Sequence, residues 1–255
     1  MRICMIGAGN LATQLGMVLK EKGHQIVQVW SRTTESASAL ALKLDCQYTT
    51  ALTAIKSESD IYIIAVSDNA IETVLSGHHW GNSLVVHTAG SIPMNLLAPY
   101  CNNFGVFYPF QTFTIAKKVV FDQVPIYIEA NTPQNLEVLK DLAQSISQDI
   151  KTFDSSQRQQ IHLAAVFVNN FVNHLYTIGE KLLSEKGLDF EILKPLILET
   201  AANVVDHSPE SSQTGPAIRN DRNVMDKHLV MLANHPDLKK LYSLVSEEII
   251  QTHKK

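Results

Sequence analysis

The chain of 255 residues has little charge, few cysteines and no long apolar run. Charged residues make up 18% of it and the net charge is −4, which excludes the basic surface that binds nucleic acids or anionic membranes. No apolar run is long enough to cross a bilayer, and the first residues lack the layout of a signal peptide. The three cysteines fit neither a zinc site nor a disulfide framework, and they are Cys4, Cys46 and Cys101. We therefore expect a soluble cytoplasmic protein without a metal.

Two glycines follow the first apolar run of the chain. Residues 3–6 predict a buried strand, and the spacing of apolar residues from Leu11 onward predicts a helix. Gly7, Gly9 and Ala12 form the pattern G-x-G-x-x-A between the two, which is typical of dinucleotide binding and far less often an ordinary glycine turn. The first glycine permits a tight turn, the second lets the backbone approach a pyrophosphate, and the alanine lets the helix pack on the strand. The expected pyrophosphate-binding residues are Gly7, Gly9, Asn10 and Leu11.

The end of the second predicted strand, residues 25–30, indicates which dinucleotide binds. A site for NAD usually has an Asp or Glu at this point, which accepts a hydrogen bond from the ribose 2′-hydroxyl. Here Ser31, Arg32 and Thr33 follow instead. A guanidinium can pair with a 2′-phosphate and the two hydroxyls can donate to it, so the sequence favours NADP. The same residues can also begin a helix, with Thr33 or Thr34 as its N-cap, and the two interpretations are compatible.

Strands and helices alternate up to residue 153, and the remainder of the chain has only helical patterns. We expect an α/β domain with a doubly wound parallel sheet over residues 1–153 and an all-α domain over residues 154–255. The further strands expected are 60–66, 83–87, 105–108, 125–129 and 151–153. The helices expected are 35–44, 69–75, 133–146, 155–186, 190–205, 224–233 and 237–251, with a helical turn at 51–56.

Two loops follow strands at the edge where open α/β sheets bind ligands. In residues 66–69, Asp68 is either near the nicotinamide ribose or an ordinary N-cap. In residues 88–91, the glycine allows a close approach to the nicotinamide end. The expected coenzyme contacts in these loops are Val66, Ser67, Thr88 and Gly90.

A third loop, residues 108–113, combines aromatic side chains with Gln111. This composition is typical of a pocket wall with one polar anchor, although the aromatic rings can equally pack beneath the second domain.

Polar residues share one face of the first predicted helix of the helical domain. His162, Asn169 and Asn173 recur at helical spacing, and buried amides there would need partners. A structural role is the simpler interpretation for His162 alone, whereas the three together favour a stripe that faces substrate. An imidazole ordinarily titrates near neutrality, so His162 is the candidate general acid and the two asparagines would orient the substrate.

The segment 214–221 contains a turn at Gly215-Pro216 and two charged residues. Arg219 either pairs with Asp221 to order the loop or binds a substrate carboxylate through both nitrogens.

Several motifs occur in an order that resembles a known family. In the first half they are Gly-Ala-Gly-Asn-Leu-Ala at 7–12, Ser-Arg-Thr at 31–33, Ala-Val-Ser-Asp at 65–68, His-Thr-Ala-Gly-Ser at 87–91 and Tyr-Pro-Phe-Gln-Thr-Phe at 108–113. In the second half they are residues 162–170 and 214–221. The chain resembles Rossmann-like NADP oxidoreductases with a C-terminal domain of unknown function (DUF2520). These are related to pyrroline-5-carboxylate reductase, to 6-phosphogluconate and 3-hydroxyacid dehydrogenases, and to deazaflavin-dependent NADP reductases.

The resemblance implies a Rossmann domain with NADP, then an all-α domain like the C-terminal domain of 6-phosphogluconate dehydrogenase. It also implies a homodimer through the helical domain, with the active site in the cleft between the domains. Two departures concern the substrate. Hydroxyacid dehydrogenases have a lysine four residues before an asparagine, where this chain has Ala165 and Val166. The segment 214–221 also differs from the Ser/Thr-rich loop of pyrroline-5-carboxylate reductases.

We therefore expect an NADP(H)-dependent oxidoreductase that acts on a small C=O or C=N substrate. The expected catalytic and substrate-binding residues are His162, Asn169, Asn173, Gln111 and Arg219. Two alternatives remain open. One is a regulator or scaffold that binds NADPH without turnover, which the absent lysine favours. The other is hydride exchange with a flavin or deazaflavin.

Overall fold

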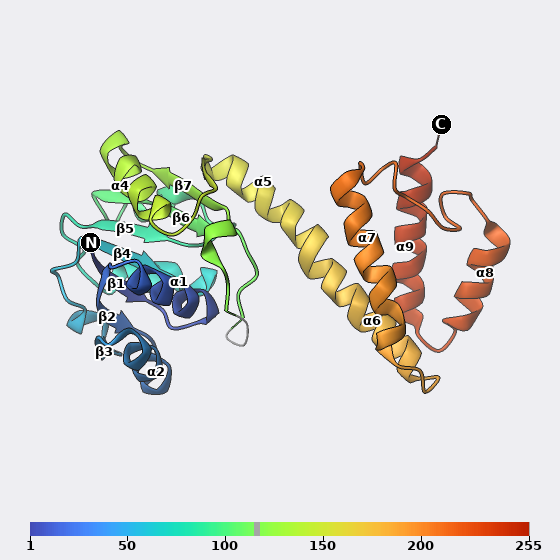
Figure 1. The fold of residues 1–255 in the computed structure, drawn as a ribbon, viewed down its shortest axis with the longest axis horizontal. Helices are drawn as coiled ribbons and strands as arrows, with labels where there is room; N and C mark the ends of the chain where they lie inside the picture. The colour runs from blue at the N-terminus through green and yellow to red at the C-terminus, as the bar shows by residue number, and fades with distance from the viewer. Residues whose placement is uncertain (115–117, 255) are drawn as a thin grey trace. The chain divides into compact units, whose positions relative to one another are not determined.

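The computed structural model describes residues 1–114 and 118–254, and Figure 1 shows the course of the chain. The chain divides into two compact units, Met1–Asn173 and His174–Lys255. The secondary structure becomes entirely helical from Ser155 onward. The first helical segments nevertheless belong to the compact unit that contains the sheet.

The first unit is built on a sheet of eight strands in the order β3-β2-β1-β4-β5-β6-β7-β8. The strands are β1 (Arg2–Ile6), β2 (Gln25–Trp30), β3 (Gln47–Thr49), β4 (Ile61–Ile64), β5 (Leu84–His87), β6 (Asn103–Pro109), β7 (Ile126–Ala130) and β8 (Ile150–Thr152). Every neighbouring pair is parallel except β6 and β7. This confirms the predicted fold class, a doubly wound Rossmann domain followed by helices.

The sheet departs from the prediction in two places. β7 runs antiparallel to β6, because the described part of their connection contains only a short 3-10 turn and no crossover helix that would make the pair parallel. The edge strand β3 was not predicted, since three residues are too few to show an alternating pattern.

Most predicted helices of the first unit form close to their expected bounds. They are α1 (Asn10–Glu21), α2 (Thr34–Leu44), α3 (Ile71–Ser76), α4 (Pro133–Gln144) and α5 (Ser155–Ala165). The 3-10 segments are η1 (Leu52–Ala54), η2 (Asp68–Ala70), η3 (Met94–Leu97) and η4 (Phe121–Gln123). The long predicted helix 155–186 contains a π-helical segment that the sequence did not indicate, η5 (Val166–Phe171), between α5 and α6 (Val172–Ser184).

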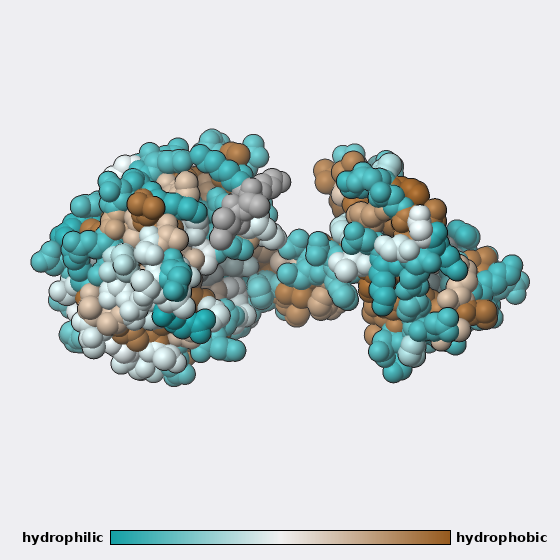
Figure 2. All heavy atoms as spheres, turned by 90° about the horizontal axis from the view of Figure 1, so that it is seen from below, coloured by the Kyte–Doolittle hydropathy of each residue, from teal (hydrophilic) through white to brown (hydrophobic). Residues whose placement is uncertain are grey.

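The second unit contains helices and turns throughout its described residues. After α6, Gly187 has a φ of +69° and ends the helical run, as the sequence predicts. The remaining elements are η6 (Phe190–Leu193), α7 (Lys194–Asp206), α8 (Arg222–Met231) and α9 (Pro236–Thr252). Apolar side chains gather on the surface of this unit (Figure 2). No helix of the described residues is long and apolar enough to cross a membrane.

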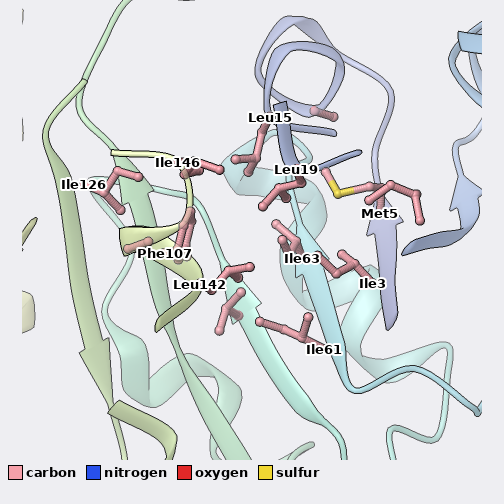
Figure 3. Close-up of a cluster of buried hydrophobic side chains, with 14 of the residues drawn as sticks. Ile3, Met5, Leu15, Leu19, Ile61, Ile63, Phe107, Ile126, Leu142 and Ile146 are labelled. Carbon is pink, nitrogen blue, oxygen red and sulfur yellow. The ribbon is translucent and has the colours of Figure 1, made fainter. Parts of the chain in front are cut away.

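Both faces of the sheet are covered by apolar clusters. Ile3 and Met5 of β1 point into one cluster, which α1, α2 and α4 complete (Figure 3). The alternate residues Cys4 and Ile6 point into the other cluster, which α3 and η3 complete. Burial on both faces explains why the strands have continuous apolar sequences, and it leaves only the strand ends free to bind a ligand.

Candidate functional site

A hollow of about 260 Å³ lies where β1, β2 and β4 end and α1 begins. Six of the residues predicted to bind coenzyme line it, namely Gly7, Gly9, Ser31, Arg32, Val66 and Ser67. Ser36, which the sequence analysis did not select, also lines it. This residue lies in the first turn of α2, and that position is the signal that could have identified it.

The two glycines of the turn are required for different structural reasons. Gly7 has a φ of +119°, and a Cβ there would lie 2.3 Å from the carbonyl oxygen of Ala65, so no other residue fits. Gly9 has an ordinary extended conformation, and a Cβ there would meet no atom within 4 Å. The space in front of Gly9 is therefore open, and a side chain would project into it.

The first turn of α1 offers free backbone donors beside this space. No side chain caps the helix at Gly9, and the first amide that bonds back to it is that of Thr13, 2.9 Å from the Gly9 carbonyl oxygen. The side chain of Asn10 donates to the carbonyl oxygen of Phe113 at 3.0 Å, and Leu11 packs against the core. These two residues therefore offer their backbone amides to a ligand. Unbonded amides at a helix start suit a pyrophosphate.

Of the residues after β2, one caps the next helix and the others line the hollow. Thr33 is the N-cap of α2, with its Oγ1 accepting from the amide of Ser36 at 3.4 Å and donating to Ser36 Oγ at 3.0 Å. Thr33 is thus the helix cap that the sequence left open as an alternative. Ser31, Arg32 and Ser36 remain at the hollow, where one guanidinium and two hydroxyls suit a 2′-phosphate.

A second hollow of about 370 Å³ lies between residues 108–112 and the helical run of α5 and η5. Tyr108 Oη lies 3.2 Å from His162 Nδ1. A Cβ at Gly90 would come within 2.6 Å of that nitrogen and 2.8 Å of that oxygen, so both side chains lie directly against the loop after β5. Three segments that the sequence singled out separately therefore meet at one point.

Amide groups surround this pair in the same hollow. Asn169 donates from Nδ2 to Thr112 Oγ1 at 2.7 Å, which connects η5 to the loop after β6. Gln111 is exposed, and its Oε1 accepts from the amide of Thr112 at 2.8 Å. π-helical turns occur often at functional sites, and this one carries Asn169 and Asn170 into the lining of the hollow.

Tyr108 is a functional candidate that the sequence analysis treated only as part of a pocket wall. Burial raises its pKa to about 12, and the charges of Tyr127 and Asp68 act in the same direction. The phenol therefore stays protonated at neutral pH. Its position one residue before the end of β6, at the ligand-binding edge of the sheet, is the signal that could have identified it.

The loops after β4 and β5 are joined to each other. Ser91 donates from Oγ to Asp68 Oδ2, and Ser67 occupies the N-cap position of η2 that the sequence left open for Asp68. Thr88 is buried, and its Oγ1 donates to the carbonyl oxygen of Ile64 at 3.4 Å. Its hydroxyl is therefore used in a hydrogen bond at the edge of the sheet, and a ligand would contact the backbone of this loop.

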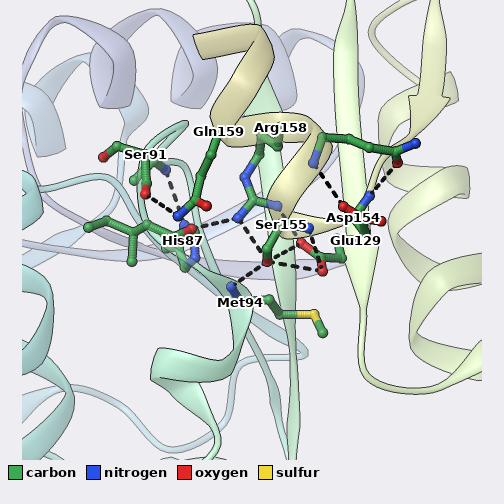
Figure 4. A network of polar contacts seen from close by, with 11 residues as sticks. His87, Ser91, Met94, Glu129, Asp154, Ser155, Arg158 and Gln159 are labelled. Carbon is green, nitrogen blue, oxygen red and sulfur yellow. Dashed lines mark hydrogen bonds and ion pairs between the residues drawn. The ribbon is translucent and has the colours of Figure 1, made fainter. Parts of the chain in front are cut away.

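The start of α5 is held by a buried polar network (Figure 4). Arg158, with 1% of its side chain exposed, pairs with Glu129 of β7 and also donates to the carbonyl oxygen of Ile92. Ser155 donates from its amide and its hydroxyl to the same carboxylate, at 3.0 and 2.9 Å. His162 lies one helical turn after Arg158, so this network determines where the imidazole lies.

Two further candidates are not among the residues that line either hollow. Asn173 is exposed near the start of α6. Arg219 is exposed in the second unit, where Asp221 caps α8 by accepting from the amide of Val224 at 3.2 Å. That bond engages the carboxylate that the sequence left open as the partner of Arg219.

Comparisons with known proteins assign both halves of the chain. Residues 2–90 match the family described as NADP oxidoreductase coenzyme F420-dependent, and residues 124–249 match a domain of unknown function, DUF2520. A crystal structure from Bacteroides fragilis, of a protein assigned as an NADP oxidoreductase, is 44% identical with a TM-score of 0.91 and covers 98% of each chain. No curated protein matches.

More distant solved structures share the fold. The 1-pyrroline-5-carboxylate reductase of Streptococcus pyogenes is 16% identical with a TM-score of 0.63, covering 98% of each chain. An imine reductase from Myxococcus stipitatus in complex with NADP+ is 14% identical with a TM-score of 0.73, covering 99% of this chain and 95% of that one. Together with the closer match, these findings show that the chain belongs to the Rossmann-fold NADP oxidoreductases with a DUF2520 domain, whose cofactor is NADP.

Proposed function

We propose that the protein reduces the C=O or C=N bond of a small substrate with NADPH. The observation that carries this proposal is the contact of Tyr108 and His162 on the backbone of Gly90. A proton donor is thereby fixed at the strand ends, close to the loop expected to receive the nicotinamide. The reductases with a similar fold include an imine reductase and a pyrroline-5-carboxylate reductase, which supports C=N as one of the two bond types.

The coenzyme would occupy the hollow at the first turn. The backbone amides from Gly9 to Leu11 would hold the pyrophosphate, because the helix start leaves them without acceptors, and Gly7 would form the turn beside it, since its own amide donates to the carbonyl oxygen of Trp30 at 2.8 Å. Ser31 and Arg32 would bind the 2′-phosphate, with Ser36 as an added donor. The nicotinamide would lie near Val66, Ser67, Thr88 and Gly90, with the Thr88 contact made through its backbone. Bound there, NADPH supplies a hydride to an electrophilic carbon.

The chain's own residues would position and protonate the substrate. His162 would be part of the general acid, the group that gives a proton to the oxygen or nitrogen atom of the reduced bond. Asn169 and Gln111 would donate hydrogen bonds that fix the substrate, since both line the hollow beside the imidazole. Asn173 and Arg219 are proposed as further substrate contacts, because an amide and a guanidinium can hydrogen-bond to the polar groups of a small substrate.

We assign residues 154–255 to substrate binding and to dimerisation. The helices α6, α7 and α9 bury no residue in the single chain, although all three carry apolar side chains. Such faces are typical of a surface that a second subunit covers.

A substitution at Gly9 tests this function, because a methyl group there would contact a bound ligand and no atom of the protein itself. Gly9→Ala should fold normally, at a cost of at most about 1 kcal/mol, and should weaken NADPH binding at least about tenfold. Gly179→Ala is the matched control, since that glycine also has no positive φ, a Cβ there would meet only the flexible end of the Leu193 side chain at 3.3 Å, and it does not line the hollow. NADPH consumption by the wild-type protein is then measured with keto acids, aldehydes and imines.

Turnover with at least one substrate, together with weakened binding in Gly9→Ala alone, supports the proposal. Tight NADPH binding without turnover across the whole panel would favour the regulator or scaffold instead. The absence of the dehydrogenase lysine at Ala165, which lines the second hollow, is the observation that keeps this alternative. Equal NADPH affinity in Gly9→Ala and the wild type would show that the coenzyme does not bind in this hollow.

A further inference from the structure

Only two of the described side chains that line the second hollow carry a titratable group. The lining consists otherwise of aliphatic, phenyl, amide and hydroxyl groups, which neither gain nor lose protons there. Tyr108 and His162 are the two, and they contact each other at 3.2 Å. A proton for the substrate must therefore come through this pair or directly from water.

Tyr108 is the more rigidly held member of the pair. It lies within β6 and pairs in register with Tyr127 of the neighbouring strand β7. Its ring makes edge contacts with Phe110 and Tyr127, at centroid distances of 6.0 and 6.2 Å. A phenol fixed to a strand end can be aimed at a reacting atom with little loss of freedom.

Tyr108 lies on the sheet side of the second hollow, next to the end of β6. Asp68 acts electrostatically on Tyr108, and it directly follows Ser67, which lines the coenzyme hollow. His162 instead belongs to α5, on the side of the second hollow formed by the helical run. A proton moving from His162 to Tyr108 would therefore move from the helix to the edge of the sheet, where the coenzyme is expected.

The chemistry of the two groups suits transfer in that direction. Burial raises the pKa of Tyr108 to about 12, Tyr127 and Asp68 add to the effect, and the positive charge of Arg158 opposes it. A phenol with so high a pKa can still protonate the more basic oxygen or nitrogen anion that hydride addition forms, and the tyrosinate left behind must then regain a proton. The Nδ1 of His162 is in contact with Tyr108 Oη and can supply that proton.

We infer that Tyr108 delivers the proton to the substrate and that His162 restores it from solvent. This deepens the proposed function and rests on it. The hydride adds to the carbon of the double bond, the π electron pair moves to the oxygen or nitrogen, and that atom takes the Oη proton of Tyr108. The Nδ1 proton of His162 moves to Tyr108 Oη, and the imidazole regains a proton from water. The net reaction consumes one hydride and one proton.

Tyr108→Phe tests the relay because it removes the phenolic oxygen and keeps the ring. With the best substrate of the panel, its kcat should fall at least about a hundredfold while the NADPH Kd stays within about twofold. His162→Ala should lower kcat similarly, and combining both changes should add little, since the two groups act as one unit. Tyr127→Phe is the matched control, because it removes a neighbouring phenol that does not contact His162, and its kcat should stay within about threefold.

Two spectroscopic measurements on the NADP-bound protein test the contact independently of turnover. Tyrosinate absorbance during alkaline titration should lack a component near pH 12 in Tyr108→Phe, compared with the wild type. The ¹⁵N resonance of His162 Nδ1 should shift in Tyr108→Phe and stay in place in Tyr127→Phe, since only the first change removes its hydrogen-bond partner.

Each failure has a distinct signature. A kcat above about a third of the wild-type value in Tyr108→Phe would overturn the relay and leave the reductase function standing. An unchanged ¹⁵N resonance would also overturn it, because the two groups would then not be coupled. A wild-type protein that consumes no NADPH with any substrate would overturn the proposed function itself, and the relay with it.

Discussion

The residues of the nucleotide-binding turn perform separate tasks that the structure distinguishes. Gly7 is required by the backbone, since its φ of +119° and the nearby carbonyl of Ala65 leave no room for a side chain. Gly9 is required only by the space in front of it. A glycine motif therefore combines one constraint from folding with one from the ligand, and substitutions at the two positions should have different consequences.

His87, the last residue of β5, is a buried titratable residue beside the site. It is fully buried, and its Nδ1 accepts from the amide of Ala89 at 3.2 Å, which orders the loop that carries Gly90. Burial, and secondarily the positive charge of Arg158, lower its pKa from 6.5 to about 3. The folded protein therefore keeps this imidazole neutral under conditions in which the unfolded chain protonates it.

The free energy of unfolding should accordingly depend on pH through His87. Between pH 6.5 and about 3 the unfolded chain binds the extra proton, so stability falls as the pH decreases through this range. The slope from this group is at most about 1.4 kcal/mol per pH unit, and it vanishes above the range. Urea denaturation of the wild type and of His87→Asn across this range measures the difference. His79→Asn, a change at an exposed imidazole, is the control, and equal slopes in wild type and His87→Asn would contradict the prediction.

Among the elements, α5 has the most direct influence on the site, because it carries His162. Its start is fixed by a capping box of Asp154 and Gln157 and by the buried pair of Arg158 with Glu129. A buried ion pair with further hydrogen bonds adds little net stability, yet losing one partner leaves a buried charge unpaired. The pair therefore makes one position of α5 much more favourable than the others.

Arg158→Met should lower the free energy of unfolding by about 3–5 kcal/mol, because it leaves the Glu129 carboxylate without its cation. Lys140→Met is the matched control. It breaks the exposed pair of Lys140 and Glu137, at 3.9 Å, and should cost no more than about 1 kcal/mol. Thermal or urea denaturation of both variants measures the difference. Similar losses in the two would show that the buried pair does not hold α5.

Elements defined by local patterns were predictable, whereas those defined by distant partners were not. β2 has its predicted bounds, Gln25–Trp30, because alternation and β-branched residues are properties of the segment itself. The antiparallel direction of β7 depends on its pairing with β6, and the π-helical turn at 166–171 does not follow from apolar spacing. The contact of Tyr108 with His162 joins residues that are 54 positions apart in the sequence, so it could be found only from the three-dimensional structure.

At the scale of the whole molecule, the helical unit lacks a core of its own. In its described residues the buried apolar side chains are Ala217, Met225 and Leu232. Large apolar side chains are instead exposed, including Leu196, Leu198, Val204, Val205, Val230, Met231 and Leu244. Because its other apolar side chains are only partly buried or exposed, the hydrophobic burial within this unit is small for some eighty ordered residues, each of which loses conformational entropy on folding. The missing burial must come from another surface, and a second copy of the chain supplies one by symmetry.

The protein should therefore be a dimer in solution, and charges introduced on α7 should dissociate it. Leu198 and Val205 are 71% and 83% exposed in the single chain, so Leu198→Glu and Val205→Glu would cost the monomer little and would bury a carboxylate in the dimer. Leu42→Glu is the control, since Leu42 is 85% exposed on α2 of the first unit. Sedimentation equilibrium should show a dimer for the wild type and Leu42→Glu and a shift toward monomer for the α7 variants. A monomeric wild type would contradict the predicted dimer, and an unchanged dimer in both α7 variants would show that its interface does not include this face of α7.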